Sequence, residues 1–549
     1  MCGIVGVISK KQTKSIDSIV SDMANSIESR GPNGEGFYIY DNIAFGHRRL
    51  SIIDLKGGKQ PMSDDTNQYS VTYNGELYNY KLLRIELEKK GFNFRTDSDT
   101  EVILNSYICW GEGCLNRFRG MFAFAILDKL KDTVFLARDP FGIKPLCFYN
   151  DESFFAFSSE ISAFKKIPGF DKTISLQALD MYLWLQYIPA PESIFKSVKK
   201  LMPGHCMLLD KDGNTLYNKA YNNFSFKPDF KRKESDWLEE LDHKLEKSVK
   251  LHLMSDVPYG AFLSGGIDST AIVSIMAKEL KKPIKTFSIG FNESSFSELP
   301  YARKVAEKWG TDHYEEIVEP EALKILPDLV RHYGEPFGDS SALPTYYLSK
   351  LAAEHVPMVL SGDGGDEIFA GYGSHINWMK EISKPDWVEN LPSIRQKIYP
   401  ILNKLSPNKY PKTWKKPRFD VWIKYVEYLN TNWRTKLWKN EYKQFIQVKN
   451  TSVENSFSEG LKFQGVNTVQ YFDIQNYLPN DILTKVDIAS MMHGLEVRTP
   501  LIDMELWDFA LTIPEKFNIQ KVNNNHWEGK LLLKKWLEIG HFNTIYYSS

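Results

Sequence analysis

The sequence has no long hydrophobic run and almost no net charge, and each absence excludes a class of protein. No apolar stretch approaches the roughly 18 residues of a membrane-spanning helix, and the N-terminus lacks a signal-peptide core. The 68 basic residues balance 69 acidic ones, for a net charge of −1, which gives no electrostatic attraction to nucleic acid or to an anionic membrane. We therefore expect a cytoplasmic protein with neither kind of partner.

Cysteine is also scarce, because the chain has only five and no C-x-x-C pair. An odd number argues against a fully paired disulfide framework. Cys2 differs from the others, because removal of Met1 would place a thiol and an α-amine on one residue. An amine with a pKa of about 7.7–8.0 is well suited to take the thiol proton. The alternative is a small residue near the start codon. The other four are expected to be buried small apolar residues: Cys109, Cys114, Cys147 and Cys206.

A length of 549 residues predicts two to four domains. In residues 1–205, short apolar segments alternate with turn signals, which predicts an antiparallel β-rich unit with helices over Tyr80–Lys90 and Thr100–Trp110. A polar stretch follows, and we expect domains at 1–207 and 234–549 joined by a linker at 208–233. The predicted strands are Gly3–Ile8, Gly36–Tyr40, Tyr69–Tyr73, Met121–Leu127, Thr133–Ala137 and Phe154–Ser158.

From Glu234 onward, long helical patterns alternate with short apolar strands. This alternation predicts a parallel sheet covered by helices on both faces. The region from Ile376 to Glu515 is expected to be largely helical. The predicted helices are Trp237–His252, Ser269–Leu280 and Leu299–Trp309, and the predicted strands are Ala261–Leu263, Ile284–Phe291 and Val356–Leu360.

Two glycine-rich turns follow predicted strands of this second unit. In Leu263–Thr270, two glycines allow close backbone approach, and the first amides of a helix would face an anion. A plain strand–helix turn with an N-cap is the alternative. The second turn, Ser361–Glu367, would open on the same carboxyl edge of the sheet, where ligands bind. Carboxylates beside an anionic nucleotide require a divalent cation, so we predict Asp268 and Asp366 as Mg²⁺ ligands.

With Met1–Gly6, these motifs resemble the glutamine-hydrolysing asparagine synthetase family over nearly the whole chain, from Cys2 to about Lys535. The resemblance implies an N-terminal glutaminase of the Ntn-hydrolase type with an αββα arrangement. It also implies a C-terminal synthetase with an adenine-nucleotide α-hydrolase-like (PP-loop) parallel sheet and added helices. Ammonia would pass between the two through an internal tunnel.

The resemblance assigns glutamine-binding and catalytic roles in the first half. The Gly46–Asp54 segment would bind glutamine, with Arg49 on its α-carboxylate. From the residues alone, Asn74-Gly75 could form a hairpin turn and Asp99 could be an N-cap. The resemblance instead implies that Asn74 and Gly75 donate to the oxyanion. It also implies that Asp99 and Glu76 bind the substrate amine. The expected glutamine-binding residues are Arg49, Ile53, Asn74, Gly75, Glu76 and Asp99.

In the second half the resemblance implies an ATP site and a catalytic lysine. Lys485 would meet pyrophosphate, although on pattern alone it could pair with Asp481 one helical turn earlier. Asp363 would lie near the acceptor. The matching segments Arg138–Leu146, Ser158–Glu160 and Glu496–Leu501 are interpreted as structural. The expected ATP-binding residues are Leu263, Ser264, Gly265, Gly266, Asp268, Ser269, Ile289, Ser361 and Gly362.

Two features depart from the family pattern. Asp363 stands where asparagine-forming members usually have glutamate, so the identity of the acceptor stays open. The version of the motif with aspartate resembles a subgroup associated with envelope polysaccharides or secreted products. The family's basic C-terminal segment is replaced by His541–Ser549, which offers no cation for phosphate. We therefore expect ordinary glutamine hydrolysis with weak or poorly coupled amide formation.

The resemblance thus implies an ATP- and Mg²⁺-dependent ligase that uses ammonia from glutamine to amidate an adenylated aspartate. A homodimer is one assembly that the sequence leaves open. The first alternative keeps this machinery with another carboxylate, such as a uronic acid or a peptide. A sugar-phosphate or phosphoribosyl amidotransferase would share the Cys2 domain but does not need the Ser264–Ser269 turn. An inactive scaffold with residual glutaminase activity is the last alternative.

Overall fold

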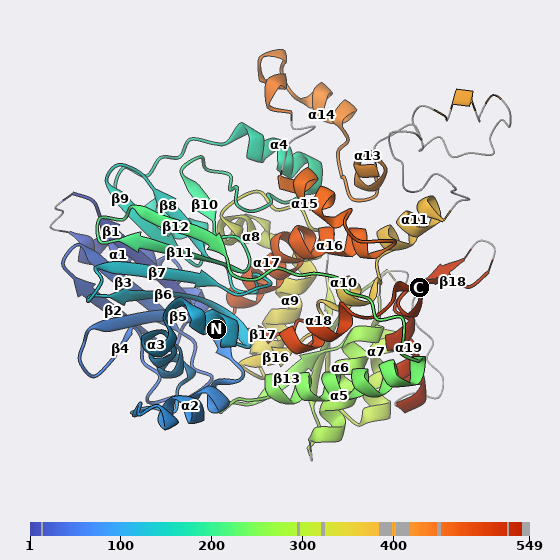
Figure 1. The fold of residues 1–549 in the computed structure, drawn as a ribbon, viewed down its shortest axis with the longest axis horizontal. Helices are drawn as coiled ribbons and strands as arrows, with labels where there is room; N and C mark the ends of the chain where they lie inside the picture. Colours follow the sequence, from blue (N-terminus) through green and yellow to red (C-terminus); the bar gives the residue numbers. More distant parts are fainter. Residues whose placement is uncertain are drawn as a thin grey trace.

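The computed structural model describes residues 1–11, 15–280, 282–293, 297–319, 324–383, 418–446, 452–523 and 526–540, with residues 398, 400, 401 and 404. Figure 1 shows the N-terminal half, in blue to teal, beside the green, yellow and red C-terminal half. The altered C-terminal segment, residues 541–549, lies outside the described residues, so the expectation attached to it stays a prediction.

The N-terminal half contains two six-stranded sheets whose strand pairs are antiparallel. The first has the order β10 (Val198–Lys200), β8 (Cys147–Asn150), β9 (Phe154–Ser158), β1 (Gly3–Ser9), β3 (Ile43–Arg49), β2 (Gly34–Tyr40). The second has the order β12 (Thr215–Ala220), β11 (His205–Asp210), β7 (Thr133–Arg138), β6 (Gly120–Asp128), β5 (Tyr69–Leu77), β4 (Met62–Ser63).

Apolar side chains on the facing sides of the two sheets form one core, as Ile4 and Phe45 of the first sheet do with Ala125 and Leu136 of the second. Helix α1 (Ile16–Asn25) covers the outer face of the first sheet. Helices α2 (Tyr80–Lys89) and α3 (Asp99–Trp110) cover the second. The four layers confirm the expected αββα glutaminase fold.

The C-terminal half contains a five-stranded parallel sheet with helices on both faces, as expected (Figure 1). Two of its strands were not predicted, because β15 is mostly polar and β17 is only three residues long. The chain leaves β13 toward β14 on one side and later reaches β16 on the other, so a topological switch point lies between β13 and β16. The order is β15 (Asp312–Val318), β14 (Lys285–Phe291), β13 (Tyr259–Phe262), β16 (Met358–Leu360), β17 (Glu496–Arg498).

Helices pack around this sheet, and the described part of the expected helical region, from Ile376 to Glu515, is mostly helical. Among the described residues, no helix combines the length and apolarity needed to cross a membrane. The helices are α4 (Leu176–Leu185), α5 (Glu234–His252), α6 (Ile267–Glu279), α7 (Leu299–Trp309), α8 (Leu326–Tyr333), α9 (Ala342–Ala353), α10 (Gly365–Phe369), α11 (Gly373–Ile382), α13 (Arg418–Ile423), α14 (Thr431–Leu437), α15 (Ser452–Gly460), α16 (Asn467–Gln475), α17 (Leu483–Met491), α18 (Met504–Ala510) and α19 (Leu531–Gly540); β18 (Gln520–Lys521) pairs with β19 (Trp527–Glu528).

The two halves share a buried interface. One apolar cluster contains Met1, Ile52 and Phe141 together with Leu241 and Trp507. The division into 1–207, 208–233 and 234–549 remains a proposal, and within the joining segment β12 pairs with β11 in the second sheet.

Charged groups also cross this interface. The Arg119 guanidinium makes two hydrogen bonds to the Asp503 carboxylate, at 2.6 and 2.8 Å. Arg30 and Lys144 both pair with Asp487 of α17, at 2.8 and 3.2 Å. Bidentate and buried ion pairs fix the relative orientation of the groups they join, so these contacts hold the two halves in one relative orientation.

Candidate functional sites

Cys2 directly precedes β1 and lies buried beside Asn74 of β5. Its backbone N–H donates to Oδ1 of Asn74 at 2.8 Å, and its Sγ lies 3.8 Å from the carbonyl oxygen of Leu50. Burial raises the pKa of the Cys2 thiol, and the N-terminal ammonium opposes this effect. The structure therefore brings together Cys2 and Asn74, which the sequence predicts as nucleophile and oxyanion donor.

The Asn74–Gly75 turn predicted from the sequence as an alternative does not occur, because both residues lie inside β5 and pair with β6. Asn74 is fully buried, and its Nδ2 has no hydrogen-bond partner among the described residues. A buried amide donor without a partner is costly unless a ligand accepts from it. A Cβ at Gly75 would clash with the carbonyl oxygen of Met121, so only glycine allows this strand pairing.

The two carboxylates predicted to bind the glutamine amine are also buried near β5. Asp99, in the first turn of α3, accepts from the Tyr73 hydroxyl and the Leu77 amide, both at 3.0 Å. Burial raises its pKa, and these hydrogen bonds oppose the shift. The N-cap of α3 is Ser98, whose hydroxyl accepts from the Thr100 amide, so Asp99 is not the cap.

Arg49 ends β3 and points into the loop that follows it. Its guanidinium donates to the carbonyl oxygens of Asp54 at 2.6 Å and Leu55 at 3.0 Å, beside half-buried Ile53. A Cβ built on Gly58 would touch both Arg49 and Ser98. The loop thus places Arg49 next to the start of α3, where Asp99 lies, as expected for residues that bind the two ends of one amino acid.

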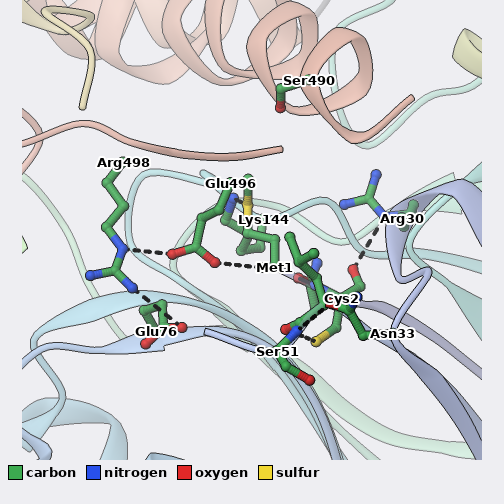
Figure 2. Close-up of polar contacts among 12 residues, drawn as sticks. Met1, Cys2, Arg30, Asn33, Ser51, Glu76, Lys144, Ser490, Glu496 and Arg498 are labelled. Atoms are coloured by element: carbon green, nitrogen blue, oxygen red, sulfur yellow. Dashed lines mark hydrogen bonds and ion pairs between the residues drawn. The ribbon is translucent and has the colours of Figure 1, made fainter. Parts of the chain in front are cut away.

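A charged cluster continues from this site into the synthetase half, as Figure 2 shows. Glu76 pairs with Arg498 of β17 at 3.4 Å, and Arg498 donates to Glu496 at 2.6 Å. The ammonium group of Met1 pairs with the second oxygen of Glu496. Burial would raise the pKa of Glu496, but the N-terminal ammonium and Arg498 lower it to about 2. Burial holds the pKa of Glu76 well above its usual range despite Arg498.

The second site is a cavity of 410 Å³ at the switch point between β13 and β16. Both predicted glycine-rich turns and Lys485 open onto it. Gly265 and Gly266 belong to the first turn but do not line the cavity. The predicted residues that line it are Leu263, Ser264, Asp268, Ser269, Ile289, Ser361, Gly362, Asp363, Asp366 and Lys485.

Hydrogen bonds to two serine hydroxyls stabilise the first turn. The Ser264 and Ser269 hydroxyls are 3.1 Å apart, and the Gly266 amide donates to Ser264 Oγ at 3.1 Å. Gly265 has a φ of +80°, and a Cβ there would lie 2.5 Å from the backbone of α7, so the position requires glycine. Asp268 and Ser269, in the first turn of α6, line the cavity. An anion bound there would lie at a helix N-terminus, which favours negative charge.

Lys530 bridges the two carboxylates predicted as metal ligands. Its Nζ lies 2.5 Å from Asp268 Oδ2 and 2.7 Å from Asp366 Oδ1. Burial raises the pKa of Asp268 to about 6, and Lys530 opposes this shift. Lys530 is not among the residues predicted from the sequence, because it reaches the two aspartates from a distant part of the chain.

The same carboxylates fit a divalent cation. Asp268 Oδ1 is buried and has no partner among the described residues, which leaves one hard oxygen available. No cluster of three or more His, Cys, Asp or Glu side chains suited to a metal occurs in the described part of the chain. A Mg²⁺ ion here would therefore take its other oxygen ligands from phosphates and water, as Mg²⁺ commonly does.

Lys485 does not pair with Asp481, the alternative that the helical spacing suggested. Its Nζ donates to Asp339 Oδ2 at 2.9 Å and to Ser341 Oγ at 2.7 Å. Asp363, the residue in the place of the family's glutamate, accepts from Ser361 Oγ at 2.5 Å. Asp339 lies far from Lys485 in sequence, so no local pattern could have identified it as the partner.

The comparisons with known proteins agree with this geometry. The family described as asparagine synthase matches residues 240–539, and that described as glutamine amidotransferase domain matches residues 1–222. The chain belongs to the asparagine synthase family. This membership confirms the family, the two-part fold and the ligase class that the motifs predict.

Several relatives align over most of their length. The chain is 36% identical over 549 residues to asparagine synthetase (glutamine-hydrolyzing) 1 of Bacillus subtilis, covering 98% of this chain and 84% of the relative. It is 38% identical over 419 residues to a putative asparagine synthetase (glutamine-hydrolyzing) 2 of Methanocaldococcus jannaschii, covering 71% and 79%. A putative asparagine synthetase of Mycobacterium bovis is 31% identical over 551 residues, covering 96% and 84%.

Proposed function

We propose that the protein is a glutamine-dependent asparagine synthetase. It hydrolyses glutamine and uses the ammonia to amidate an ATP-adenylated aspartate, giving asparagine, AMP and pyrophosphate. The observation that carries this proposal is the cavity at the switch point, where both glycine-rich turns and Lys485 converge in the same chain as the Cys2–Asn74 pair.

The first half supplies the groups that glutamine hydrolysis needs. After removal of Met1, the α-amine of Cys2 would take the thiol proton, and the thiolate would attack the amide carbon of glutamine. The unpartnered Nδ2 of Asn74 and the amide of Gly75 would stabilise the oxyanion. Arg49 would hold the α-carboxylate, and Asp99 with Glu76 the ammonium. The oxyanion would then collapse and break the C–N bond, and the proton held by the Cys2 amine would leave with the nitrogen as ammonia. Water would hydrolyse the remaining thioester to glutamate and free the Cys2 thiol.

The second half supplies the groups that activate a carboxylate. The Ser264–Ser269 turn and Ser361 would bind the phosphates, with Leu263, Ile289 and Gly362 against the nucleoside. Asp268 and Asp366 would hold Mg²⁺, which when bound neutralises charge on the phosphates. Lys485 would stabilise the departing pyrophosphate, near the acceptor beside Asp363.

Separating the two reactions has a chemical reason. A carboxylate does not react with ammonia at neutral pH, so it must first become an acyl-adenylate. Ammonia in water is mostly ammonium, which is not a nucleophile. We propose that ammonia crosses inside the protein, through the core that both halves share between Ile52 and Leu241. We also propose that the enzyme is cytoplasmic, because ATP and glutamine are available there. A homodimer is a separate proposal.

One assay tests this function directly. The enzyme is incubated with glutamine, ATP, Mg²⁺ and aspartate, and glutamate, asparagine, AMP and pyrophosphate are measured together. We expect all four products, with AMP and asparagine in equal amounts. Glutamate without AMP for any acid would instead support the scaffold with residual glutaminase activity.

A second acceptor is supported by one observation. A further cavity of 240 Å³ adjoins the ATP cavity, since Tyr372 lines both. Tyr187, Tyr425 and Tyr477 also line it, and aromatic walls suit a larger acceptor than aspartate. We therefore propose as the alternative a uronic acid of an envelope polysaccharide or a peptide carboxylate. Amide formation with glucuronate or a glutamyl peptide, but not with aspartate, would favour it.

A further inference from the structure

Lys530 lies at an unusual position in the ATP site. It directly precedes α19, and its φ of +55° is a left-handed backbone conformation that residues other than glycine rarely adopt. Its amide donates to the carbonyl oxygen of Phe369, at the end of α10, at 3.0 Å. Unfavourable backbone conformations that persist in a fold often mark functional positions. The backbone is therefore held so that this side chain enters the site.

The Lys530 side chain is closely surrounded by Gly371 and Asp366. A Cβ at Gly371 would clash with both Lys530 and Asp366, so the absence of a side chain there lets the ammonium reach the carboxylate. The Lys530 side chain is only 11% exposed. Its two partners come from turns that follow different strands, Asp268 after β13 and Asp366 after β16. The Lys530 ammonium thus links the two glycine-rich turns of the predicted phosphate site.

The two carboxylates share one cation. Their negative charges repel each other across a half-buried site, and an ammonium at 2.5 and 2.7 Å offsets that repulsion. A divalent cation held by both carboxylates would stand next to this ammonium. The two positive charges would then repel each other, so both cannot occupy the full carboxylate pair.

We propose that Lys530 and the divalent cation compete for Asp268 and Asp366: Lys530 holds the pair in the nucleotide-free enzyme and releases it when the metal–nucleotide complex binds. The proposal rests on the metal assignment made for the proposed function. It makes Lys530 a positioning residue that preserves the spacing of the two turns. The released ammonium, beside two carboxylates that line the cavity, then becomes available to the nucleotide.

The test is metal binding to the full chain without nucleotide. Mn²⁺ serves as the probe, measured by electron paramagnetic resonance and by calorimetry. Lys530→Met should bind Mn²⁺ at least about fivefold more tightly than the wild type, the lower end of usual coupling between two ligands. Lys530→Arg keeps the charge and should resemble the wild type. Lys534→Met, within α19 and paired with Glu528, is the matched control and should not change Mn²⁺ affinity.

A stability measurement keeps the proposal testable if binding is weak. Without metal, Lys530→Met should melt at a lower temperature than the wild type, because two half-buried carboxylates lose the cation that they share. Added Mn²⁺ should raise its melting temperature more than that of the wild type. Adding Asp366→Asn to Lys530→Met should remove the gain in Mn²⁺ affinity.

Equal Mn²⁺ affinity in the wild type and Lys530→Met, or no effect of Asp366→Asn on the gain, would overturn the competition. The amide assay with aspartate judges the proposed function separately. Amide formation by the wild type with unchanged Mn²⁺ affinity in Lys530→Met would reject only the role of Lys530. A gain in Mn²⁺ affinity without any amide product would reject only the proposed function.

Discussion

The two candidate sites keep their charged groups in different ways. In the glutaminase half, Arg49 donates to backbone carbonyls of the loop after β3, and Asp99 accepts from the Leu77 amide and the Tyr73 hydroxyl. In the synthetase half, Asp268 and Lys485 are bound to other side chains, Lys530 and Asp339. Backbone partners are fixed by the fold, whereas side-chain partners can rotate away. Under the proposed function, the first site would suit one small amino acid in one pose, and the second would suit exchange of ions.

The difference extends to the boundary between the halves. Glu76 belongs to the glutaminase site, yet its charged partner, Arg498, belongs to β17 of the synthetase sheet. The backbone carbonyl of Arg498 accepts from the amide of Ser361, the first residue of the second glycine-rich turn, at 2.8 Å. One residue thus contacts both sites. The sequence motif containing Arg498 was interpreted as structural, and the contacts show which parts it connects.

The largest expected effect separates the two sites completely. Cys2→Ala should lower glutamine-dependent amide formation by at least about 10³-fold, because the nucleophile is lost. Ammonia-dependent amidation should continue, because no described contact joins the Cys2 side chain to the ATP cavity. Glutamate and amide are measured with glutamine and then with ammonium chloride as nitrogen source. Cys109→Ala is the control, and loss of both activities in folded Cys2→Ala would contradict this division.

The next effect should appear only in the second site. Asp268→Asn and Asp366→Asn should each lower ATP conversion to AMP and pyrophosphate by about 10²-fold, because each removes a charged ligand of the metal–phosphate complex. Basal glutaminase activity should remain. Asp312→Asn is the matched control, since this exposed aspartate begins β15 at the opposite edge of the same sheet. Undiminished pyrophosphate release in either variant would remove the metal assignment.

Local sequence patterns were sufficient for most of the fold. Residues 299–309 form α7 and residues 154–158 form β9 as predicted, because each is bounded by turn residues and has a clear apolar pattern. The strand β17 was missed because three residues carry no periodicity. Its position is set by pairing with β16 inside the sheet, which is a tertiary contact.

The site could be predicted where its residues stand in contiguous motifs. The turns at Ser264 and Ser361 were found because glycine, serine and aspartate occur together after apolar strands. Lys530 and Asp339 were missed as partners, because each is brought to the site from a distant part of the chain. Pairing of charges across a sheet edge leaves no signal in a single sequence.

The smallest expected effect concerns a carboxyl group beside the acceptor region. Asp481 lines the second cavity, and its Oδ1 has no partner among the described residues. Burial and the nearby Asp339 raise its pKa to about 8. A folded-state pKa above the unfolded value of about 3.9 means that the stability contributed by this group is complete below pH 4 and is lost as the pH rises toward 8.

Asp481→Asn has no carboxylate to ionise in the buried site, so it should be more stable than the wild type by ~1 kcal/mol or more at pH 8. The gain should vanish near pH 4, as measured by urea unfolding across that range. Asp420→Asn, at an exposed position of α13, should show no such trend, and a gain independent of pH would show that Asp481 is ionised in the folded protein.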